Sequence, residues 1–298
     1  MLAPMVLFVY NRPVHTQKVL NALAQNELAH QSTIYIYSDG PKELKQDIDS
    51  VIEVRNIIRK TYTFNEVIII ESEYNKGLAN SIVQGVSSVL ETHSSVIILE
   101  DDVVTSKWFL TYMNQALRIY EKDLNVMHIN GYVPPITQKL PPFFFTRLMQ
   151  CWGWATWDRA WHKFIADPEF LYSEINLLSK ARLFDGNTHG FFLKQLENNI
   201  SGRRNTWAIK WYASIFLNNG YCLSPMASLT QNIGGDGSGA NVKFEEVFDT
   251  VVSREKPDLK VSNVEIYDEH ERILYGFYRK HNNLFHKIMR VIDATLFR

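Results

Sequence analysis

Short apolar segments alternate with longer amphipathic segments throughout the first hundred residues of the chain. Strands are predicted at Leu7–Tyr10, Thr33–Tyr37, Glu66–Ile70 and Ser95–Leu99, with apolar residues at helical spacing between them. Strand and helix segments that alternate in this way form right-handed crossovers between parallel strands. The pattern therefore predicts an α/β fold with a mostly parallel sheet flanked by helices.

The composition excludes several classes of protein. The 298 residues are 46% hydrophobic and 21% charged, which is typical of a soluble globular chain and not of a disordered one. The formal net charge of -1 provides no overall positive field for nucleic acid, so no nucleic-acid partner is expected. Cys151 and Cys222 cannot form a disulfide framework, and the apolar N-terminus contains Pro4 and lacks the basic start of a signal peptide. We therefore expect a cytoplasmic protein.

The pattern changes after Tyr132. Prolines and aromatic residues become frequent, and all seven tryptophans lie between Trp108 and Trp211. Helices are predicted at Trp154–Phe164, Phe191–Asn199 and Trp207–Leu217, with a short strand near Tyr221–Leu223. The expected organisation is one domain with halves at residues 1–130 and 131–260, followed by a helical tail at 261–298.

Three consecutive acidic residues, Glu100, Asp101 and Asp102, directly follow the fourth strand. Ligands of open parallel sheets bind in the crevice beyond the carboxyl ends of the strands, which is where these residues fall. Adjacent carboxylates repel one another, and Mg²⁺ or Mn²⁺ would compensate their charge. The alternative is an acidic turn that caps a helix beginning near Thr105.

Polar residues and a glycine follow the other three strands at the same predicted edge. They are Asn11 and Arg12 after the first strand, Asp39 after the second, and Lys76, Gly77 and Asn80 after the third. A bound nucleotide needs such a mixture, because a carboxylate accepts from a base or ribose, a cation contacts phosphate and a glycine allows close backbone approach. Ordinary turns and helix caps use the same residue types, so that interpretation also stays open.

Five segments together carry a resemblance to a known family. They are Val9-Tyr-Asn-Arg-Pro13, Tyr37-Ser-Asp-Gly-Pro41, Asn75-Lys-Gly-Leu-Ala-Asn-Ser81, Leu99-Glu-Asp-Asp102 and Trp152-Gly-Trp-Ala-Thr-Trp157. In their order and spacing, across roughly residues 5 to 240, the chain resembles nucleotide-sugar-dependent glycosyltransferases of the GT-A (Rossmann-like) fold. Its particular likeness is to bacterial sugar transferases related to the N-acetylglucosaminyltransferase I family.

The resemblance implies a role for each motif. Asp102 would ligate Mn²⁺ or Mg²⁺, Asp101 would support the metal or contact the ribose, and Glu100 would hold the donor. Asp39 matches a position that hydrogen-bonds uracil, and Arg12 lies in the matching loop after the first strand. Residues 1–130 would then bind the donor, and residues 131–260 the acceptor.

The implied reaction is metal-dependent, inverting transfer of a hexosyl or N-acetylhexosaminyl group. The donor would be a nucleoside diphosphate sugar, with UDP favoured, and the acceptor a glycan or lipid-linked hydroxyl in bacterial surface polysaccharide synthesis. Two alternatives stay open, namely a nucleotidyltransferase of similar fold and a catalytically inactive sugar-nucleotide binder.

The catalytic base is the point at which the chain departs from the family. Members carry an aspartate directly after a tryptophan, but Trp207 is followed here by Ala208, which cannot accept a proton. Asp236, in the glycine-rich segment Gly234–Gly239, is the preferred candidate base. The other candidates are Asp158, Asp185 and Glu197.

Aromatic rings are suitable platforms for the apolar faces of sugars. Trp152, Trp154 and Trp207 are therefore predicted to bind the acceptor, with Gly153 in a loop that, by resemblance, closes against the transferred sugar. By contrast, Trp157 and Trp161 are four residues apart, which predicts packing from one helix face.

The C-terminal tail is basic and amphipathic from Arg272 to Arg298. Such a helix can lie in an anionic membrane surface, which predicts peripheral contact at the inner face of the plasma membrane. The alternative is a terminal helix docked on the body of the protein.

Overall fold

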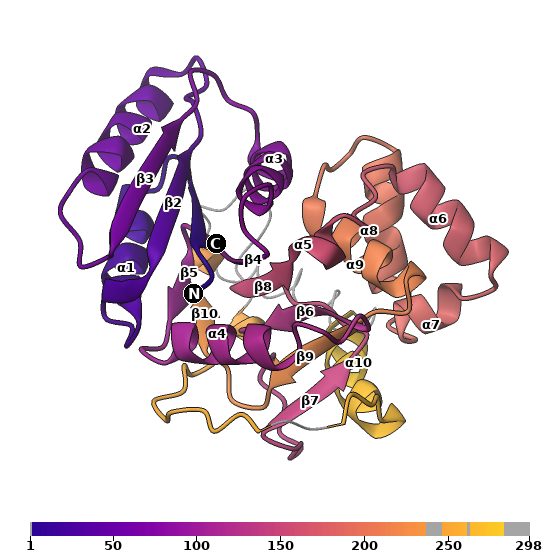
Figure 1. The fold of residues 1–298 in the computed structure, drawn as a ribbon. Coiled ribbons are helices and arrows are strands. Elements are labelled where there is room, and N and C mark those ends of the chain that lie inside the picture. Colours follow the sequence, from indigo (N-terminus) through magenta and orange to yellow (C-terminus); the bar gives the residue numbers. More distant parts are fainter. Residues whose placement is uncertain (1, 237–245, 261–262, 283–298) are drawn as a thin grey trace, which may run out of the picture.

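The computed structural model describes residues 2–236, 246–260 and 263–282. An eight-stranded sheet with the order β3-β2-β1-β4-β8-β6-β9-β7 runs through the protein (Figure 1). Its strands are β1 (Met5–Val9), β2 (Thr33–Ser38), β3 (Glu66–Glu71), β4 (Ser95–Glu100), β6 (Val126–Asn130), β7 (Phe143–Thr146), β8 (Trp154–Trp157) and β9 (Tyr221–Pro225). Two further strands, β5 (Val103–Thr105) and β10 (Thr230–Asn232), form a separate antiparallel ribbon.

Ten α-helices surround the sheet in the described part of the chain. They are α1 (Pro13–Ala24), α2 (Lys45–Ile58), α3 (Leu78–Leu90), α4 (Phe109–Ile119), α5 (Asp158–Trp161), α6 (Pro168–Leu177), α7 (Ala181–Asp185), α8 (Phe191–Ile200), α9 (Trp207–Leu217) and α10 (Asp268–Asn282). The predicted α/β fold with a mostly parallel sheet is confirmed, since β3, β2, β1 and β4 are mutually parallel, as are β6 and β9.

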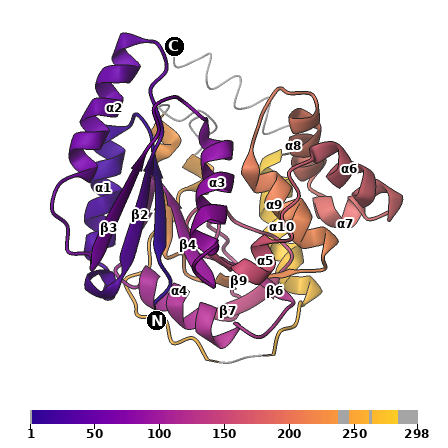
Figure 2. The same ribbon diagram turned by 45° about the horizontal axis from the view of Figure 1, so that its top comes forward.

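The sheet is the middle layer of three. Alternate residues of β1 point to opposite faces, so that Leu7 packs in one hydrophobic core and Val6 and Phe8 in the other. Helices α1, α2 and α4 cover the first face, and α3, α9 and α10 cover the second (Figure 2). Because β1 and β4 are covered on both faces, they consist almost entirely of apolar residues.

One predicted helical region is wrong in its first part. Trp154–Phe164 was expected to be one helix, but Trp154–Trp157 forms β8, which pairs antiparallel with β4 and β6. All four residues of β8 are buried, and a short apolar run of this kind is ambiguous between strand and buried helix. Trp157 therefore does not share a helix face with Trp161. Thr105 ends β5, and the helix expected near it, α4, begins four residues later at Phe109.

Helix α10 docks on the body of the protein. Leu274, Tyr275 and Tyr278 are buried in the core, and Glu271 is ion-paired with Arg147, which follows β7. The apolar face of the tail up to Asn282 therefore packs on the protein, as the docking alternative predicted, and residues 283–298 lie outside the described residues. No helix in the described ranges is both long and apolar enough to cross a bilayer.

His128 on β6 is a buried histidine whose protonation state follows from its partners. The indole N–H of Trp211 can only donate, so it donates to Nδ1, 3.1 Å away, and Nε2–H donates to the carbonyl of Gln150 at 3.0 Å. Burial lowers the pKa of His128 to about 3, and its hydrogen-bond partners only partly offset this. The imidazole is therefore neutral in the folded protein.

This burial predicts that the protein loses stability in acid. The unfolded chain binds a proton at His128 near its ordinary pKa of about 6.5, whereas the folded chain does not. The contribution of His128 to the free energy of unfolding is therefore fully present above that pH and is lost as the pH falls below it. The free energy of unfolding should drop by up to about 1.4 kcal/mol per pH unit from this residue alone. Urea unfolding between pH 4 and 7 measures the slope. His128→Gln should have a flatter slope than the wild type, and equal slopes would contradict the assignment.

Candidate functional site

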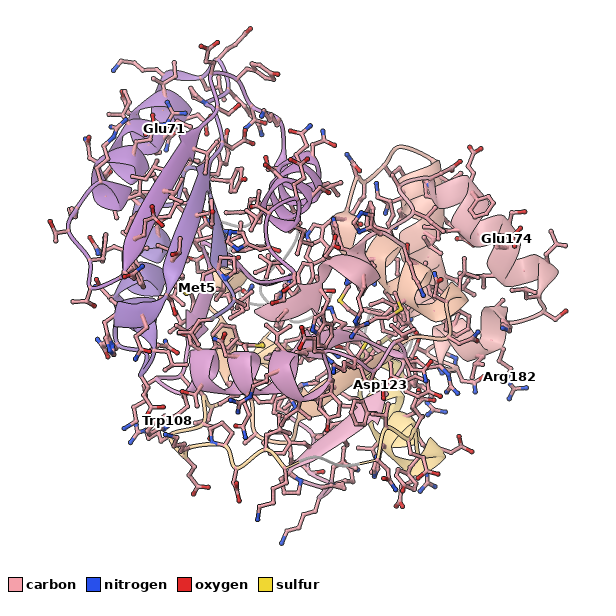
Figure 3. The ribbon with its side chains drawn as sticks, viewed as in Figure 1. Met5, Glu71, Trp108, Asp123, Glu174 and Arg182 are labelled. Atoms are coloured by element: carbon pink, nitrogen blue, oxygen red, sulfur yellow. The ribbon has the colours of Figure 1, made fainter. Side chains whose placement is uncertain are left out.

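The order of the strands locates a crevice at the carboxyl edge of the parallel sheet. Helices α1 and α2 link β1 to β2 and β2 to β3 on one face, and α3 then returns on the other face to β4 beside β1. The connections therefore change direction between β1 and β4, and ligands of such sheets bind outside the carboxyl ends at this point. In Figure 3, Met5 marks the amino end of β1 and Glu71 the carboxyl end of β3, so the crevice lies at the edge marked by Glu71.

Arg12, at the end of β1, joins the two aspartates that follow β4. Its guanidinium donates to Asp101 Oδ1 and, at 3.0 Å, to Asp102 Oδ2. Burial would lower the pKa of Arg12, but the two carboxylates outweigh it and raise that pKa above its ordinary value. Arg12 is thus a fixed cation at the crevice that compensates the acidic residues.

Glu100 differs from the two aspartates because no cation among the described residues forms an ion pair with it, although the charge of Arg12 lowers its pKa in part. Burial and the charges of Asp102 and Asp101 raise the pKa of Glu100 well above its usual range, although a hydrogen bond from Trp207 partly opposes this. Cys151 lies close enough that Glu100 and Asp102, together with burial, raise the pKa of its thiol. The cluster thus includes a residue from the second half of the chain, and Cys151 is not a reactive thiolate.

The segment after β10 packs directly on the acidic pair. The N–H of Ile233 donates to the backbone oxygen of Asp102 at 2.8 Å, and a Cβ on Gly234 would overlap Asp102 Oδ2. Asp236 Oδ2 lies 3.2 Å from Nε2 of His15, a residue in the first turn of α1. Asp236, the predicted base, therefore stands two residues from the glycine that touches Asp102. His15 was not predicted, and only its position just after Asn11-Arg12-Pro13 could have suggested it.

Asp39 holds the second and third strand ends together. Oδ1 accepts from the N–H groups of Gly40 and Lys76, both at 2.9 Å, and Oδ2 accepts from the N–H of Gly77 at 2.9 Å and from Asn75 Nδ2 at 3.2 Å. Gly77 has a φ of 76°, which favours glycine and aims its N–H at the carboxylate. In this structure the hydrogen-bonding capacity of Asp39 is therefore used within the protein, and its contact with uracil stays a prediction.

Replacement of Asp39 by asparagine should destabilise the protein by about 1–3 kcal/mol, because an NH₂ group would face N–H donors in place of an oxygen. Urea unfolding measures the loss. Glu73→Gln, an exposed substitution on the same loop, is the matched control and should change the free energy of unfolding by less than about 0.5 kcal/mol. Equal stability of the two variants would show that the hydrogen bonds accepted by Asp39 do not stabilise the fold.

The other residues predicted to bind the sugar nucleotide lie at the same carboxyl edge of the sheet. Asn11 Nδ2 and the hydroxyl of Tyr10 both donate to Asp47, at the start of α2. Burial would raise the pKa of Asp47, but these hydrogen bonds lower it below its ordinary value. Asp47 was missed because it lies on a predicted helix and not at a strand end.

Lys76 and Asn80 lie at the entry to α3. Lys76 donates its backbone N–H to Asp39, and its ammonium lies 6.0 Å from the ring centroid of Tyr74. Asn80 is exposed, and its Nδ2 donates to the carbonyl of Lys76 at 2.9 Å. Neither side chain contacts the acidic cluster in the described structure, so their contact with a nucleotide stays a prediction.

The predicted acceptor-side tryptophans differ in exposure. Trp154 is fully buried and stacks on His128 and on Trp207, with ring centroids 5.1 and 4.9 Å apart. Trp207 is 3% exposed, so the surroundings of both rings are those of core residues. Trp152 is half-buried and meets Tyr132 edge-on at a centroid distance of 4.5 Å.

Gly153 has a φ of 74°, and a Cβ there would press on Thr230. The residue after Trp207, Ala208, is half-buried within α9. Another candidate base, Asp185, is buried, and its carboxylate accepts from backbone N–H groups at the start of α8. Asp185 therefore serves the fold.

The cluster offers a limited fit to a divalent cation. Asp102 Oδ1 is buried and has no hydrogen-bond partner among the described residues, whereas both oxygens of Asp101 accept hydrogen bonds, from Arg12 and from the N–H of Tyr10. No group of three or more His, Cys, Asp or Glu side chains within the described ranges could hold a metal ion alone. Because Mg²⁺ is usually held by one or two carboxylates together with substrate phosphates, Asp102 fits as a ligand, and metal ligation by Asp101 stays a prediction.

Comparison with protein-family models gives no match, and no curated protein matches the sequence. Solved structures that match in part include S. aureus TarS, at 16% identity and a TM-score of 0.31, over 47% of this chain and 23% of that chain. S. aureus TarS 1-349 in complex with UDP has the same identity and TM-score, over 47% of this chain and 38% of that chain.

UDP-glucose pyrophosphorylase complexed with UDP-glucose is 10% identical, with a TM-score of 0.36, over 75% of this chain and 90% of that chain. The chain thus spans well under half the length of the two TarS chains. At these identities and TM-scores, the likeness carries no information on the reaction.

Proposed function

We propose that the chain is a nucleotide-sugar-dependent glycosyltransferase whose donor binds in the crevice between β1 and β4. The observation that carries the proposal is the meeting of Arg12, Asp102 and Gly234 at the point where the strand connections change direction. A crevice of this kind, with a fixed cation and an acidic pair, suits the diphosphate of a sugar nucleotide. Two of these residues, Arg12 and Asp102, belong to the sequence motifs that resemble GT-A glycosyltransferases.

The buried, unpaired Oδ1 of Asp102 is proposed to ligate Mn²⁺ or Mg²⁺ together with the donor diphosphate. When bound, the ion would neutralise the charge that develops on the leaving diphosphate. Arg12 holds the other oxygen of Asp102, which fixes the orientation of the carboxylate. Glu100 is proposed to hold the donor sugar or nucleotide beside it.

Inverting transfer requires a base for the acceptor hydroxyl, and Asp236 is proposed for this role. Its carboxylate is half exposed, and it is oriented by His15 at 3.2 Å. The segment that carries Asp236 already contacts Asp102 through Ile233 and Gly234. The base would thus reach an acceptor that lies over the donor site, since a base must come within hydrogen-bond distance of the proton it removes.

The acceptor is proposed to be a glycan or lipid-linked sugar that enters past Trp152 and Gly153. We further propose a hexosyl or N-acetylhexosaminyl group from a UDP-sugar and a role in bacterial surface polysaccharide synthesis. The site of action would be the cytoplasm, with peripheral contact at the inner membrane surface. For residues 268–282, such contact would involve the basic last turn of α10, with Arg279 and Lys280, because the apolar face is covered.

A thermal-shift screen of nucleoside diphosphates, with and without Mn²⁺, tests the donor site. One nucleotide at 100 times its dissociation constant should stabilise the fold by about 2.7 kcal/mol, and Mn²⁺ should increase the shift. UDP is the expected nucleotide. A uniform lack of response to every nucleoside diphosphate would contradict the proposal.

Ala208 favours one alternative, a sugar-nucleotide binder without activity. This alternative predicts the same thermal shift, but no hydrolysis of UDP-sugars and no transfer to any acceptor. The glycosyltransferase proposal predicts slow donor hydrolysis in the absence of acceptor, and this hydrolysis should fall in Asp236→Asn. Detection of released UDP therefore separates the two functions.

A further inference from the structure

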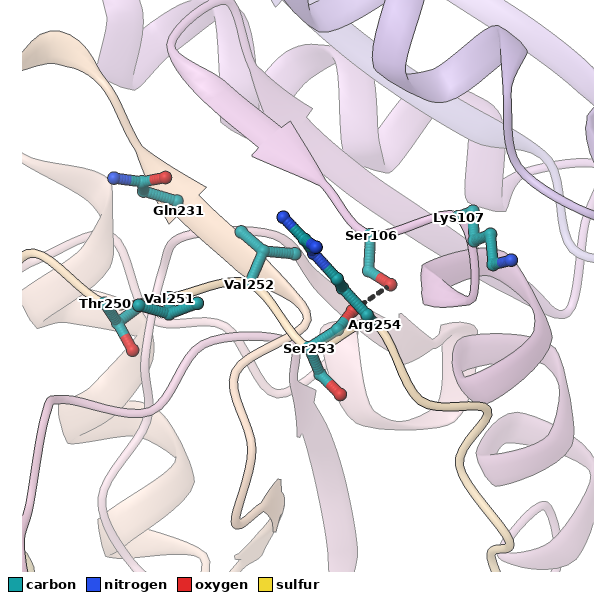
Figure 4. A pocket seen from close by; sticks show the side chains of 8 residues that line it. All are labelled: Ser106, Lys107, Gln231, Thr250, Val251, Val252, Ser253 and Arg254. Atoms are coloured by element: carbon teal, nitrogen blue, oxygen red, sulfur yellow. Dashed lines mark hydrogen bonds between the residues drawn. The ribbon is translucent and has the colours of Figure 1, made fainter.

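A cavity of about 560 Å³ lies beside the β5–β10 ribbon, outside the crevice residues described above. It is lined by Ser106, Lys107, Gln231 and residues 250–254 (Figure 4). Ser106 and Lys107 directly follow β5, and Gln231 belongs to β10. A cavity of this size lies within the range of small-molecule sites in proteins.

The wall that residues 250–254 form is fixed by hydrogen bonds. The hydroxyl of Ser106 donates to the carbonyl of Ser253 at 2.7 Å, and the N–H of Ser253 donates to the carbonyl of Ser228 at 2.7 Å. The indole N–H of Trp108 donates to the carbonyl of Arg254 at 3.0 Å. The backbone that carries Arg254 is therefore held in place, which lowers the entropy cost of binding a ligand.

Two of the lining residues, Lys107 and Arg254, carry positive charge, while the acidic residues Asp249 and Glu255 flank the lining segment 250–254 in the chain. In Figure 4 the Arg254 side chain extends across the space between Gln231 and Ser106, and its guanidinium has no ion pair with any described residue. The ammonium groups of Lys107 and Lys256 lie 4.7 and 4.8 Å from the Trp108 ring centroid. None of the lining residues is acidic, and the neighbouring Glu27 is already paired with Lys256.

We propose that this cavity is a second binding site, which takes an anionic group, a phosphate or a carboxylate, on a hydroxyl-rich acceptor. The planar guanidinium of Arg254 can donate two parallel hydrogen bonds to two oxygens of a phosphate or a carboxylate. The amide of Gln231 and the hydroxyl of Thr250 can form hydrogen bonds with hydroxyl groups of the acceptor. The acceptor role rests on the proposed glycosyltransferase function.

The ribbon connects the cavity to the crevice. Gln231 pairs with Val104, and two and three residues further on Ile233 and Gly234 contact Asp102. At no more than about 3.3 Å per residue, the three steps from Gln231 to Gly234 span at most about 10 Å, the length of two linked sugar units or less. An extended acceptor could therefore place an anionic group at Arg254 while a neighbouring sugar lies near Asp102.

NMR titrations of the full chain with glycerol 3-phosphate and with glucuronate, at fixed ionic strength, test the proposal. Glycerol is the neutral control. Binding of at least one anion is expected, and whichever binds identifies phosphate or carboxylate as the group. Arg254→Gln should weaken that binding at least tenfold, whereas Arg118→Gln, an exposed arginine on α4, should change it less than twofold.

Each anion titration is repeated in the presence of the nucleoside diphosphate that the thermal-shift screen selects. Unchanged anion binding supports a separate site, and displacement of the anion by the nucleotide overturns it. The proposal also fails if neither anion binds, or if Arg254→Gln and Arg118→Gln behave alike. If an anion binds through Arg254 but no nucleotide binds anywhere, the anion site stands and the glycosyltransferase function, with the acceptor role, falls.

Discussion

Asp102→Asn is expected to lower the rate of sugar transfer at least about 100-fold, which corresponds to about 2.7 kcal/mol or more of transition-state stabilisation. The substitution keeps the size of the side chain but removes the charge from the one carboxylate in the described part of the chain with an unpaired, buried oxygen. It also leaves Arg12 with Asp101 as its only carboxylate partner among the residues that the structure describes. Both changes weaken the electrostatic match to a metal-bound diphosphate.

Two measurements separate these consequences. Transfer is followed by release of the nucleoside diphosphate, and nucleotide affinity is measured with and without Mn²⁺. In Asp102→Asn the increase in affinity caused by Mn²⁺ should disappear. Asp49→Asn, an exposed substitution on α2, is the matched control and should change neither quantity by more than twofold. If Asp102→Asn retains metal-dependent nucleotide affinity, the metal assignment is wrong.

The parallel half of the fold could be predicted because its strands are buried on both faces. Such strands are continuous apolar runs, and the helices between them keep a regular apolar spacing. Three of the four predicted strands begin at the observed residue, and the remaining boundaries differ by one or two residues. The mixed half was harder to predict, because Trp154–Trp157 and Phe143–Thr146 are short aromatic strands without alternation.

Sequence reasoning placed Arg12 and the acidic triplet at one edge, but it did not predict how they pair. The acidic charge was expected to need a metal ion, yet Arg12, 89 residues before Asp101 in the chain, already compensates both aspartates. Contacts between side chains so far apart in the chain depend on tertiary packing, which local patterns do not encode. The same reason explains why His15 and Asp47 were missed.

Trp154→Ala is expected to cost about 3–5 kcal/mol of stability, because it would leave a large cavity in a packed core. The ring is fully buried between His128 and Trp207, and it also contacts Trp161. Urea unfolding measures the loss. Trp154→Phe should recover part of it, since a smaller ring still fills much of the space.

The KM for the acceptor, measured together with urea unfolding, decides whether Trp154 or Trp152 contacts the acceptor. Trp152 is half-buried, so Trp152→Ala should cost less stability than Trp154→Ala and should raise the KM for the acceptor with little effect on the affinity for nucleotide. If Trp154→Ala instead unfolds like the wild type and raises the acceptor KM, the ring binds sugar and its core role is wrong. A tryptophan that only fills the core cannot give unchanged stability together with a raised acceptor KM, because its removal leaves a cavity and because its ring makes no contact with the acceptor.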